Sequence, residues 1–418
     1  MGEPDTVDIV SLGAQGDGIA ETVEGPIYVP YALPGERWIV ADGGPAERLS
    51  DSPQRQPALC RHFGQCGGCI AQHMSARLYR GWKQGLVAQA FAHRGIDAPL
   101  AEMRMVLPQS RRRAVFGIAR KGGRVVLGFR EEGKHALVDL AECPVLDPSI
   151  VAALGWLREM AVIALGEDAG GRLLVTRFDN GLDVAFEGGR SRPTPEVRAA
   201  LARLAEAARL LRLSVDGDVI VIRGRPMLTS GGVTIAPPPG VFLQAVPEAE
   251  AIMIDLIVAA TDRANTVADL FCGIGTFTFP LARRARVLGV DSDRRALEAL
   301  EAAAKAAQAI KPVAVKVRDL FREPLARKEF EPFDAVVFNP PRAGAKAQAE
   351  MLAKSRVPTV VGISCNPATL ARDARILIDG GYQLEKVSPI DQFLFSPHVE
   401  AVAVFRRRAP APTKLPNK

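Results

Sequence analysis

Strand-like and helix-like segments alternate regularly between residues 267 and 405, and no other feature of the chain constrains its fold as strongly. Parallel strands need long crossover connections, which are usually helices, so the alternation predicts a mostly parallel α/β sheet. Ligands of such sheets bind beyond the carboxyl ends of the strands. The expected strands are 267–271, 286–290, 313–317, 335–338, 360–363 and 399–405, with helices at 277–284, 294–309 and 368–378.

The chain before this sheet is long enough for two further domains. Short strand-like runs separated by glycine and proline come first, and they predict a small antiparallel β-barrel. The middle of the chain combines helical patterns near 79–94 and 195–212 with several short strands, which predicts an α+β domain. The expected boundaries are 1–56 for the β-barrel, 57–245 for the α+β domain, 246–408 for the sheet domain and 409–418 for a basic tail.

Net charge is distributed unevenly along the chain. The protein carries +6 in total, of which residues 1–56 carry −7 and the other 362 residues +13. A body this basic suits a polyanion, so nucleic acid is the first partner to expect. No apolar run approaches the roughly 18 uninterrupted residues of a membrane span, and the acidic start lacks the apolar run of a signal peptide. We therefore expect a cytoplasmic protein without membrane association, and a monomer.

A glycine-containing turn follows the first strand of the predicted sheet. Its two glycines, Gly273 and Gly275, allow the backbone to approach a nucleoside, and Asp291 at the end of the second strand can hold ribose hydroxyls. The third glycine of a dinucleotide fingerprint is replaced by Thr278. We therefore expect an adenosyl ligand without a pyrophosphate, with Asp319 accepting from its adenine amino group. The alternative is a tight turn with no ligand.

The segment Asn-Pro-Pro-Arg follows the fourth strand, from Asn339 to Arg342. Two successive prolines fix the backbone where a substrate base would enter. Amino-group methyltransferases carry a similar Asn-Pro-Pro segment, usually followed by an aromatic residue that stacks on the base, but Arg342 follows here. Either an amino-group methyltransferase or a purely structural turn would account for the segment.

Two further strand ends carry groups capable of chemistry. Cys365 ends the fifth strand immediately before a helix, where free backbone amides and the helix dipole favour a thiolate. It is a candidate nucleophile, or alternatively a small buried apolar residue. Glu400 begins the last strand at the active edge of the sheet, where it is either a functional carboxylate or a solvated charge.

Four cysteines before the sheet have the spacing of a metal site. Three of them lie on one glycine-rich loop and the fourth follows far downstream: Cys60, Cys66, Cys69 and Cys143. Four thiolates suit either a tetrahedral zinc or a 4Fe-4S cluster, and spacing alone does not distinguish the two. The nearby His62 and His73 would favour zinc. Six cysteines in 418 residues are too few for a disulfide scaffold, so a reducing compartment is expected.

Basic residues are concentrated between 101 and 135, where nine of them face three acids. They include the run Arg111, Arg112 and Arg113, and also Arg130. Next to a site that modifies a base, such residues are expected to contact RNA phosphates. A solvated basic face is the alternative.

Together, these motifs resemble the RNA uridine-5-methyltransferase family, which uses S-adenosylmethionine. The resemblance is carried by Asp-Leu-Phe-Cys-Gly-Ile-Gly from 269 to 275, Ser-Cys-Asn-Pro-Ala-Thr-Leu-Ala-Arg-Asp from 364 to 373, and His-Val-Glu from 398 to 400. Upstream, residues 5–50 are similar to the family's TRAM module, and the segment from Gly240 to Gln244 is similar to its Phe-x-Gln segment. The resemblance covers nearly the whole chain.

This resemblance implies a fold, a chemistry and a set of site residues. The fold is α/β, with a Rossmann-like class I methyltransferase domain at the C-terminus, a TRAM-like β-barrel and an α+β central domain. Cys365 is the nucleophile and Glu400 the base. The implied cofactor contacts are Gln244, Phe271, Gly273, Gly275, Thr276, Asp291, Asp319 and Asn339. The implied RNA contacts are Arg111, Arg112, Arg113, Arg130 and Arg342.

The ribosomal-RNA members of this family carry the four-cysteine spacing with a 4Fe-4S cluster, which favours iron-sulfur over zinc and 23S ribosomal RNA over transfer RNA. Two residues depart from the family pattern: Asn339 stands where the family has Asp, and Thr276 replaces a commoner Asn. The negative charge of the TRAM-like segment also argues against a grip on phosphates by bulk charge. A transfer-RNA methyltransferase and a non-catalytic RNA-binding assembly factor are the remaining alternatives.

Overall fold

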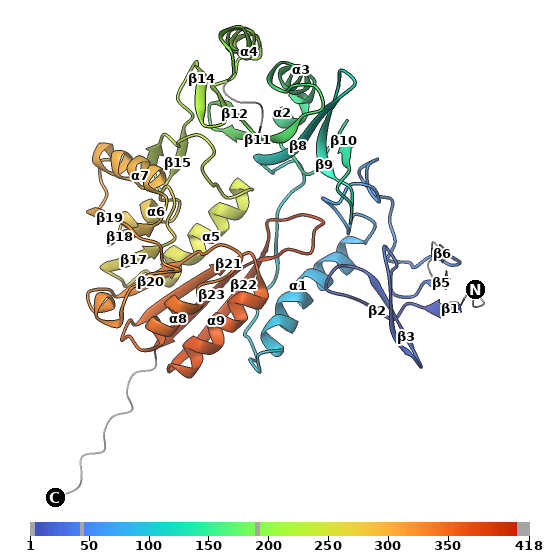
Figure 1. Ribbon diagram of the computed structural model, residues 1–418. Coiled ribbons are helices and arrows are strands. Elements are labelled where there is room, and N and C mark those ends of the chain that lie inside the picture. The colour runs from blue at the N-terminus through green and yellow to red at the C-terminus, as the bar shows by residue number, and fades with distance from the viewer. Residues whose placement is uncertain (1–4, 42–45, 189–192, 408–418) are drawn as a thin grey trace, which may run out of the picture.

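The computed structural model describes residues 5–41, 46–188 and 193–407. Figure 1 shows a C-terminal sheet domain, a central domain above it and a small N-terminal module that projects to one side. The predicted basic tail at 409–418 lies outside the described residues.

An eight-stranded mixed sheet forms the C-terminal domain, in the order β19-β18-β17-β20-β21-β23-β22-β7. Its first five strands pair in parallel, which confirms the predicted crossovers, and β23 pairs antiparallel with both of its neighbours. The prediction missed β22. It also did not include β7, a strand from the segment expected to form the central domain. The strand bounds are β7 (Arg104–Met105), β17 (Thr266–Leu270), β18 (Arg286–Asp291), β19 (Val313–Val317), β20 (Ala335–Phe338), β21 (Thr359–Ser364), β22 (Tyr382–Asp391) and β23 (Glu400–Arg407).

Helices cover both faces of this sheet, which is why β20 and β21 are buried at every position and are apolar apart from Thr359 and Ser364 at the two ends of β21. The helices are α1 (Ala76–Ala92), α5 (Pro247–Ala260), α6 (Thr278–Ala282), α7 (Arg294–Ala306), α8 (Lys346–Ala353) and α9 (Pro367–Asp379), with the 3-10 helix η1 (Arg327–Phe330). Although α1 belongs to the segment expected to form the central domain, it packs beside α9 (Figure 1). Its Val87 and Phe91 share a core with Leu370 of α9.

The central domain is a seven-stranded sheet in the order β10-β9-β8-β11-β12-β13-β14, antiparallel except where β12 pairs with β13. Its helices and strands confirm the predicted α+β character: β8 (Arg113–Lys121), β9 (Arg124–Arg130), β10 (Leu137–Asp139), α2 (Pro148–Ala152), α3 (Leu154–Ala164), β11 (Gly170–Phe178), β12 (Gly181–Glu187), α4 (Pro195–Ala207), β13 (Arg212–Val215) and β14 (Asp218–Ile222). A Cβ on Gly128 would lie 1.9 Å from the Val138 carbonyl oxygen, so only glycine allows β9 and β10 to approach this closely. A short hairpin, β15 (Leu228–Ser230) with β16 (Val233–Ile235), leads from this domain to the sheet domain.

The N-terminal module contains two three-stranded antiparallel sheets, β1-β5-β6 and β2-β3-β4. Their bounds are β1 (Asp5–Asp8), β2 (Ser11–Leu12), β3 (Gly18–Thr22), β4 (Gly25–Val29), β5 (Arg37–Val40) and β6 (Glu47–Arg48). The predicted short strands are confirmed, and their closure into a TRAM-like barrel stays a prediction. None of the described helices has the length and hydropathy needed to cross a bilayer.

Candidate active site

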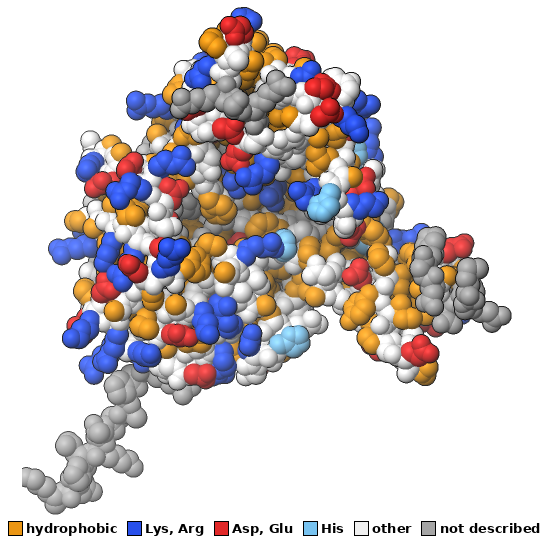
Figure 2. Space-filling model, viewed as in Figure 1, with side chains coloured by type: hydrophobic (Ala, Val, Ile, Leu, Met, Phe, Trp, Pro, Cys, Tyr) orange, Lys and Arg blue, Asp and Glu red, His pale blue; other side chains and the backbone are white. Residues whose placement is uncertain are grey.

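One cavity of about 1210 Å³ lies between the three domains and brings together most of the predicted site residues. Figure 2 shows Lys, Arg and His side chains around a hollow in the middle of the molecule. The predicted residues that line the cavity are Cys60, Cys66, Cys69, Cys143, Arg111, Arg113, Gln244, Phe271, Gly273, Asp291, Asp319, Asn339, Arg342, Cys365 and Glu400. The TRAM-like segment contributes Gln15 and Asp17 to its margin.

The turn after β17 and the end of β18 form a polar pocket of the expected kind. The Gly273 backbone N–H donates to an Asp291 carboxylate oxygen at 2.8 Å, and Gly273 has a φ of +54°, which glycine adopts easily. Each carboxylate oxygen can accept more than one hydrogen bond, so Asp291 can still bind hydroxyl groups. The ring of Phe271 packs against that of Phe321, with centroids 5.4 Å apart, next to Asp319. An adenosyl group would fit these residue types.

Gly275 and Thr276 do not line the described cavity, and their predicted cofactor contacts stay predictions. Gly275 has a φ of +93°, and a Cβ there would lie 2.8 Å from the Phe279 side chain and 3.0 Å from Leu300. The backbone carbonyl of Thr276 accepts a hydrogen bond from the Ser230 hydroxyl. These two residues shape and pack the turn, while Gly273 faces the cavity.

Cys365 lies between the end of β21 and the start of α9, as expected, and is partly buried. Burial raises the pKa of its thiol, the neighbouring Glu400 raises it further, and the Arg342 guanidinium opposes both effects. The net pKa is above the ordinary value, so the expectation of a thiolate stabilised by the helix dipole is wrong for the free protein. A nucleophilic role at this position requires deprotonation when substrate binds.

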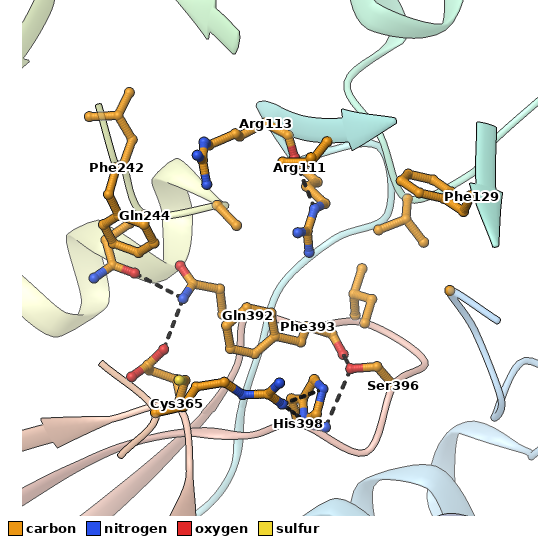
Figure 3. A pocket seen from close by; sticks show the side chains of 18 of the residues that line it. Arg111, Arg113, Phe129, Phe242, Gln244, Cys365, Gln392, Phe393, Ser396 and His398 are labelled. Atoms are coloured by element: carbon orange, nitrogen blue, oxygen red, sulfur yellow. Dashed lines mark hydrogen bonds between the residues drawn. The ribbon is translucent and has the colours of Figure 1, made fainter. Parts of the chain in front are cut away.

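Glu400 is buried at the start of β23, which excludes the alternative of a solvated charge. Burial raises the pKa of its carboxyl group to about 8, although a hydrogen bond from the Gln392 amide nitrogen at 2.9 Å favours the ionised form. The same Gln392 nitrogen donates to the Gln244 amide oxygen at 3.0 Å (Figure 3). A carboxyl group poised near neutral pH can take up or release a proton.

The loop between β22 and β23 supplies Gln392 and leads into Glu400, and helix α1 anchors this loop. Lys83 of α1 is completely buried, and its Nζ lies 2.7 Å from an Asp391 carboxylate oxygen. The same ammonium donates to backbone carbonyls of the loop, including that of Phe393. The Tyr79 hydroxyl donates to the other Asp391 oxygen.

The sequence analysis missed this anchor, although the sequence contains a signal for it. Tyr79, Lys83, Val87 and Phe91 follow one another at intervals of four residues, and all four are buried. A lysine within an apolar stripe of this spacing indicates a buried cation, and a buried cation needs a carboxylate partner.

The loop that carries Cys60, Cys66 and Cys69 also contacts the loop between β22 and β23. The backbone N–H groups of Ile70 and Ala71, immediately after Cys69, donate to the Phe395 carbonyl at 2.7 and 3.2 Å. The loop also packs on β9, since the Gly67 N–H donates to the Arg130 carbonyl at 2.9 Å.

Burial raises the pKa of all four thiols of this loop region, and Cys143 adds to the increase at each of the other three. Four soft donors this close together fit a zinc ion or an iron-sulfur cluster chemically. Among the residues that the structure describes, no group of three or more His, Cys, Asp and Glu side chains is arranged so that it could hold a metal ion. The Nε2 atom of His62 already accepts a hydrogen bond from the Ala141 N–H, so this nitrogen is not free to bind a metal ion.

The arginine run divides into two kinds of residue. Arg111 and Arg113 line the cavity, and the Arg113 guanidinium lies 5.6 Å from the Phe242 ring centroid. Arg112 is buried, with its guanidinium 2.6 Å from Glu250 and 2.9 Å from the Gln244 carbonyl oxygen. The prediction that Arg112 contacts RNA is therefore wrong, since successive side chains of an extended chain point to opposite sides. Arg112 instead fixes the segment that carries Gln244.

The two other predicted RNA contacts are both exposed. Arg342 lies at the cavity, where its guanidinium is 2.6 Å from the His398 ring. Arg130 lies at the end of β9, beside His135 and outside the described cavity lining.

Similarity to known proteins extends along nearly the whole chain. The family model described as tRNA (Uracil-5-)-methyltransferase matches residues 236–408. An uncharacterised RNA methyltransferase of Brucella suis is 47% identical over 405 residues, which cover 96% of this chain and 97% of the relative. The 23S rRNA (uracil(1939)-C(5))-methyltransferase RlmD of Alkalilimnicola ehrlichii is 33% identical over 455 residues, with 97% of each chain covered.

The chain belongs to the RNA (uracil-5-)-methyltransferase family. This methyltransferase has the fold of the Pyrococcus abyssi tRNA (uracil-54, C5)-methyltransferase, whose crystal structure contains S-adenosyl-L-homocysteine. The two structures agree with a TM-score of 0.75 at 22% identity, over 96% of this chain and 99% of the other. The family resemblance drawn from the sequence is thus confirmed, and the chain is an S-adenosylmethionine-dependent enzyme that methylates uracil in RNA.

Proposed function

We propose that the methyltransferase modifies carbon 5 of a uridine in 23S ribosomal RNA through a covalent bond between Cys365 and the base. The observation that carries the proposal is that Cys365 and Glu400 line one cavity with the carboxylates Asp291 and Asp319. The relative from Alkalilimnicola ehrlichii is named for a 23S target, whereas the family model is named for transfer RNA. The four-cysteine set, typical of ribosomal-RNA members, favours the 23S target.

When bound, S-adenosylmethionine supplies the methyl group. We assign its binding to the pocket after β17 and β18. Asp291 would accept from the ribose hydroxyls and Asp319 from the adenine amino group, with Phe271, Gly273 and Asn339 around the adenosyl group. An amide at Asn339 can still donate and accept hydrogen bonds, so the missing negative charge does not prevent binding there.

The chain's own residues carry out the steps on the base. Carbon 5 of uracil is a poor nucleophile, so Cys365 first loses its thiol proton to solvent and, as the thiolate, bonds through Sγ to carbon 6. The electron pair of the 5,6 double bond then makes carbon 5 nucleophilic. Carbon 5 then takes up the methyl group. Glu400 removes the proton from carbon 5, the double bond re-forms, and the bond between carbon 6 and Sγ breaks, which releases the thiolate.

The base must leave its stack to reach this cavity, and helical RNA hides its bases in a deep groove, so we expect a loop uridine that is flipped out. Arg111, Arg113 and Arg342 line the cavity, and their side chains are assigned to the phosphates next to the target. Figure 3 shows Arg111 and Arg113 at the cavity. Arg130 is assigned to phosphates farther away.

We propose that Cys60, Cys66, Cys69 and Cys143 hold a 4Fe-4S cluster. The proposal is supported by the four thiols that line one end of the cavity. Anaerobically purified protein is then expected to be brown and to contain about four iron atoms per chain. Stoichiometric zinc without iron would contradict the assignment.

The target is tested by mapping 5-methyluridine in 23S and transfer RNA from a strain without the gene, followed by transfer of a tritiated methyl group to the unmodified RNAs. The proposal predicts loss of one 23S position and its restoration by the purified enzyme. Loss of a transfer-RNA position instead would change the substrate assignment. A denaturation-resistant adduct with 5-fluorouridine RNA would exclude an amino-group methyltransferase acting through Asn339, and absence of any transfer would indicate an assembly factor.

A further inference from the structure

Gln392 contains a hydrogen-bond acceptor that the protein itself does not use. Its side chain is 2% exposed, and it lines the cavity together with Cys365 and Glu400. Among the residues that the structure describes, its Oε1 finds no hydrogen-bond partner, although that atom is shielded from solvent.

The orientation of this amide is fixed by its neighbours. With Glu400 ionised, as removal of a proton requires, Nε2 lies 3.0 Å from the Gln244 Oε1 and 2.9 Å from a Glu400 carboxylate oxygen, and both of these atoms are acceptors. An amide nitrogen has two hydrogens, so both are used. Turning the amide over would bring three oxygens together, which leaves Oε1 as the group that faces no donor.

An unpaired buried acceptor is unfavourable, and native proteins rarely keep one without a reason. The nitrogen of the same amide is hydrogen-bonded to Glu400, the residue assigned to remove the carbon-5 proton, so the amide lies where the uracil must bind. A ligand that brings a donor to Oε1 gains a hydrogen bond to an atom that is already desolvated and oriented, and a ligand that brings an acceptor meets repulsion.

The uracil of a nucleoside has a single hydrogen-bond donor, the N3–H group. We propose that Gln392 Oε1 accepts from uracil N3–H and is the residue that selects uracil over cytosine, whose N3 is an acceptor. This inference rests on the function proposed above.

The test compares two substrates in each of three proteins. The substrates are an RNA with the mapped target uridine and the same RNA with cytidine there, whose N3 is an acceptor in place of the N3–H donor. The proteins are the wild type, Gln392→Met and Gln348→Met. Gln348 is a matched control: it is buried on α8, and both of its amide atoms bond to the Leu325 backbone.

The measured quantity is the ratio of kcat/KM for the two RNAs. Intrinsic differences in reactivity between the bases, and any general damage by a substitution, cancel when this ratio is compared between proteins. The ratio in favour of uridine is expected to fall about 10-fold or more in Gln392→Met, and to stay at the wild-type value in Gln348→Met.

An equal ratio in the wild type and Gln392→Met would overturn the inference, even if both activities fell, because Gln392 would then be structural or would face the methyl donor. If the wild type transferred no methyl group to the uridine RNA, the proposed function itself would fail, and the inference with it. The two failures are therefore distinguishable in one experiment.

Discussion

The cavity is lined by a cluster of four cysteines and by one separate cysteine, Cys365, and their electrostatic surroundings differ. Among the four clustered cysteines, Cys66 is buried and Cys60, Cys69 and Cys143 are partly buried, and Cys143 raises the thiol pKa of each of the other three. Cys365 has no cysteine among the causes of its pKa shift; its neighbours are the carboxyl group of Glu400 and the guanidinium of Arg342.

The difference shows what each group needs to become reactive. Four clustered thiols are stable together only as thiols, or as thiolates around a positive metal group. A single thiol between a cation and a carboxyl group of raised pKa can lose its proton during a reaction and regain it afterwards. The first arrangement suits structure, and the second suits catalysis.

The largest expected effect separates the two groups by activity. Cys365→Ala should bind S-adenosylmethionine normally but lose methyl transfer and the 5-fluorouridine RNA adduct, because the bond to carbon 6 cannot form. Methyl transfer is measured with a tritiated donor. Residual turnover above about one hundredth of wild type would contradict the role of Cys365 as the nucleophile. Cys272 is buried outside the described cavity lining, so Cys272→Ala should retain near-normal turnover.

The opposite outcome is expected for the clustered group. Cys66→Ser should lose iron, colour and thermal stability before it loses the chemistry at Cys365, since metal ligation contributes folding free energy. Iron content and the unfolding temperature are measured on anaerobically purified protein. Full iron content in Cys66→Ser would remove this cysteine from the ligand set.

Substitution of Lys83 tests whether the loop between β22 and β23 depends on its contacts with helix α1 rather than on the metal group. Lys83→Met leaves the Asp391 carboxylate buried without its cation, which is expected to lower the free energy of unfolding by about 3–5 kcal/mol and to reduce methyl transfer while iron content stays unchanged. The control lies on the same helix: Arg80 pairs with Glu102 at the surface, so Arg80→Met should change stability by at most about 1 kcal/mol. Equal effects of the two substitutions in denaturant unfolding would disprove the anchor.

The smallest expected effect concerns RNA binding at the rim. When Arg111 and Arg113 are both replaced by Ala, the slope of log RNA affinity against log salt concentration should become less steep, by the amount expected for about two phosphate contacts. Arg375 is the control, because it pairs with Asp379 on α9 and does not line the cavity. An unchanged salt slope in the double variant would return these residues to the solvated-face alternative.

Much of the sheet domain and its strand ends was predictable, since the alternation of apolar strands and amphipathic helices follows directly from burial of a parallel sheet on both faces. The positions of Asp291, Asp319 and Cys365 followed from that alternation. Which glycine of the fingerprint lines the cavity was not predictable, because the fingerprint marks only a turn and the packing of Gly275 against Phe279 and Leu300 depends on tertiary structure.

The interactions of the loop between β22 and β23 were harder to predict from the sequence, because they join residues that lie far apart in the chain. The contact of Lys83 with Asp391 joins residues more than 300 positions apart. Gln392 carries no motif, and its importance arises from a hydrogen bond to Glu400 and from an oxygen left without a partner. Arg112 lay within a basic run, and its burial against Glu250 depends on tertiary packing.

The pKa of Glu400 gives the direction of a pH effect on the last step. With a pKa of about 8, the carboxyl group is mostly protonated at lower pH and cannot accept the carbon-5 proton. Release of the methylated RNA from Cys365 in a single turnover should therefore accelerate as pH rises through about 8 and level off at higher pH. Glu400→Gln should abolish this dependence.

The most direct test of the account is the fate of RNA on Glu400→Gln. Addition of Cys365 and methyl transfer both precede removal of the carbon-5 proton, and loss of a positioned base slows that removal by about 10²–10⁴-fold. A protein–RNA band that carries the methyl label should therefore persist on a denaturing gel, and Cys365→Ala in the same background should eliminate it. Near-normal turnover without a band, or lost activity without a labelled band, would contradict the roles assigned to Glu400 and Cys365.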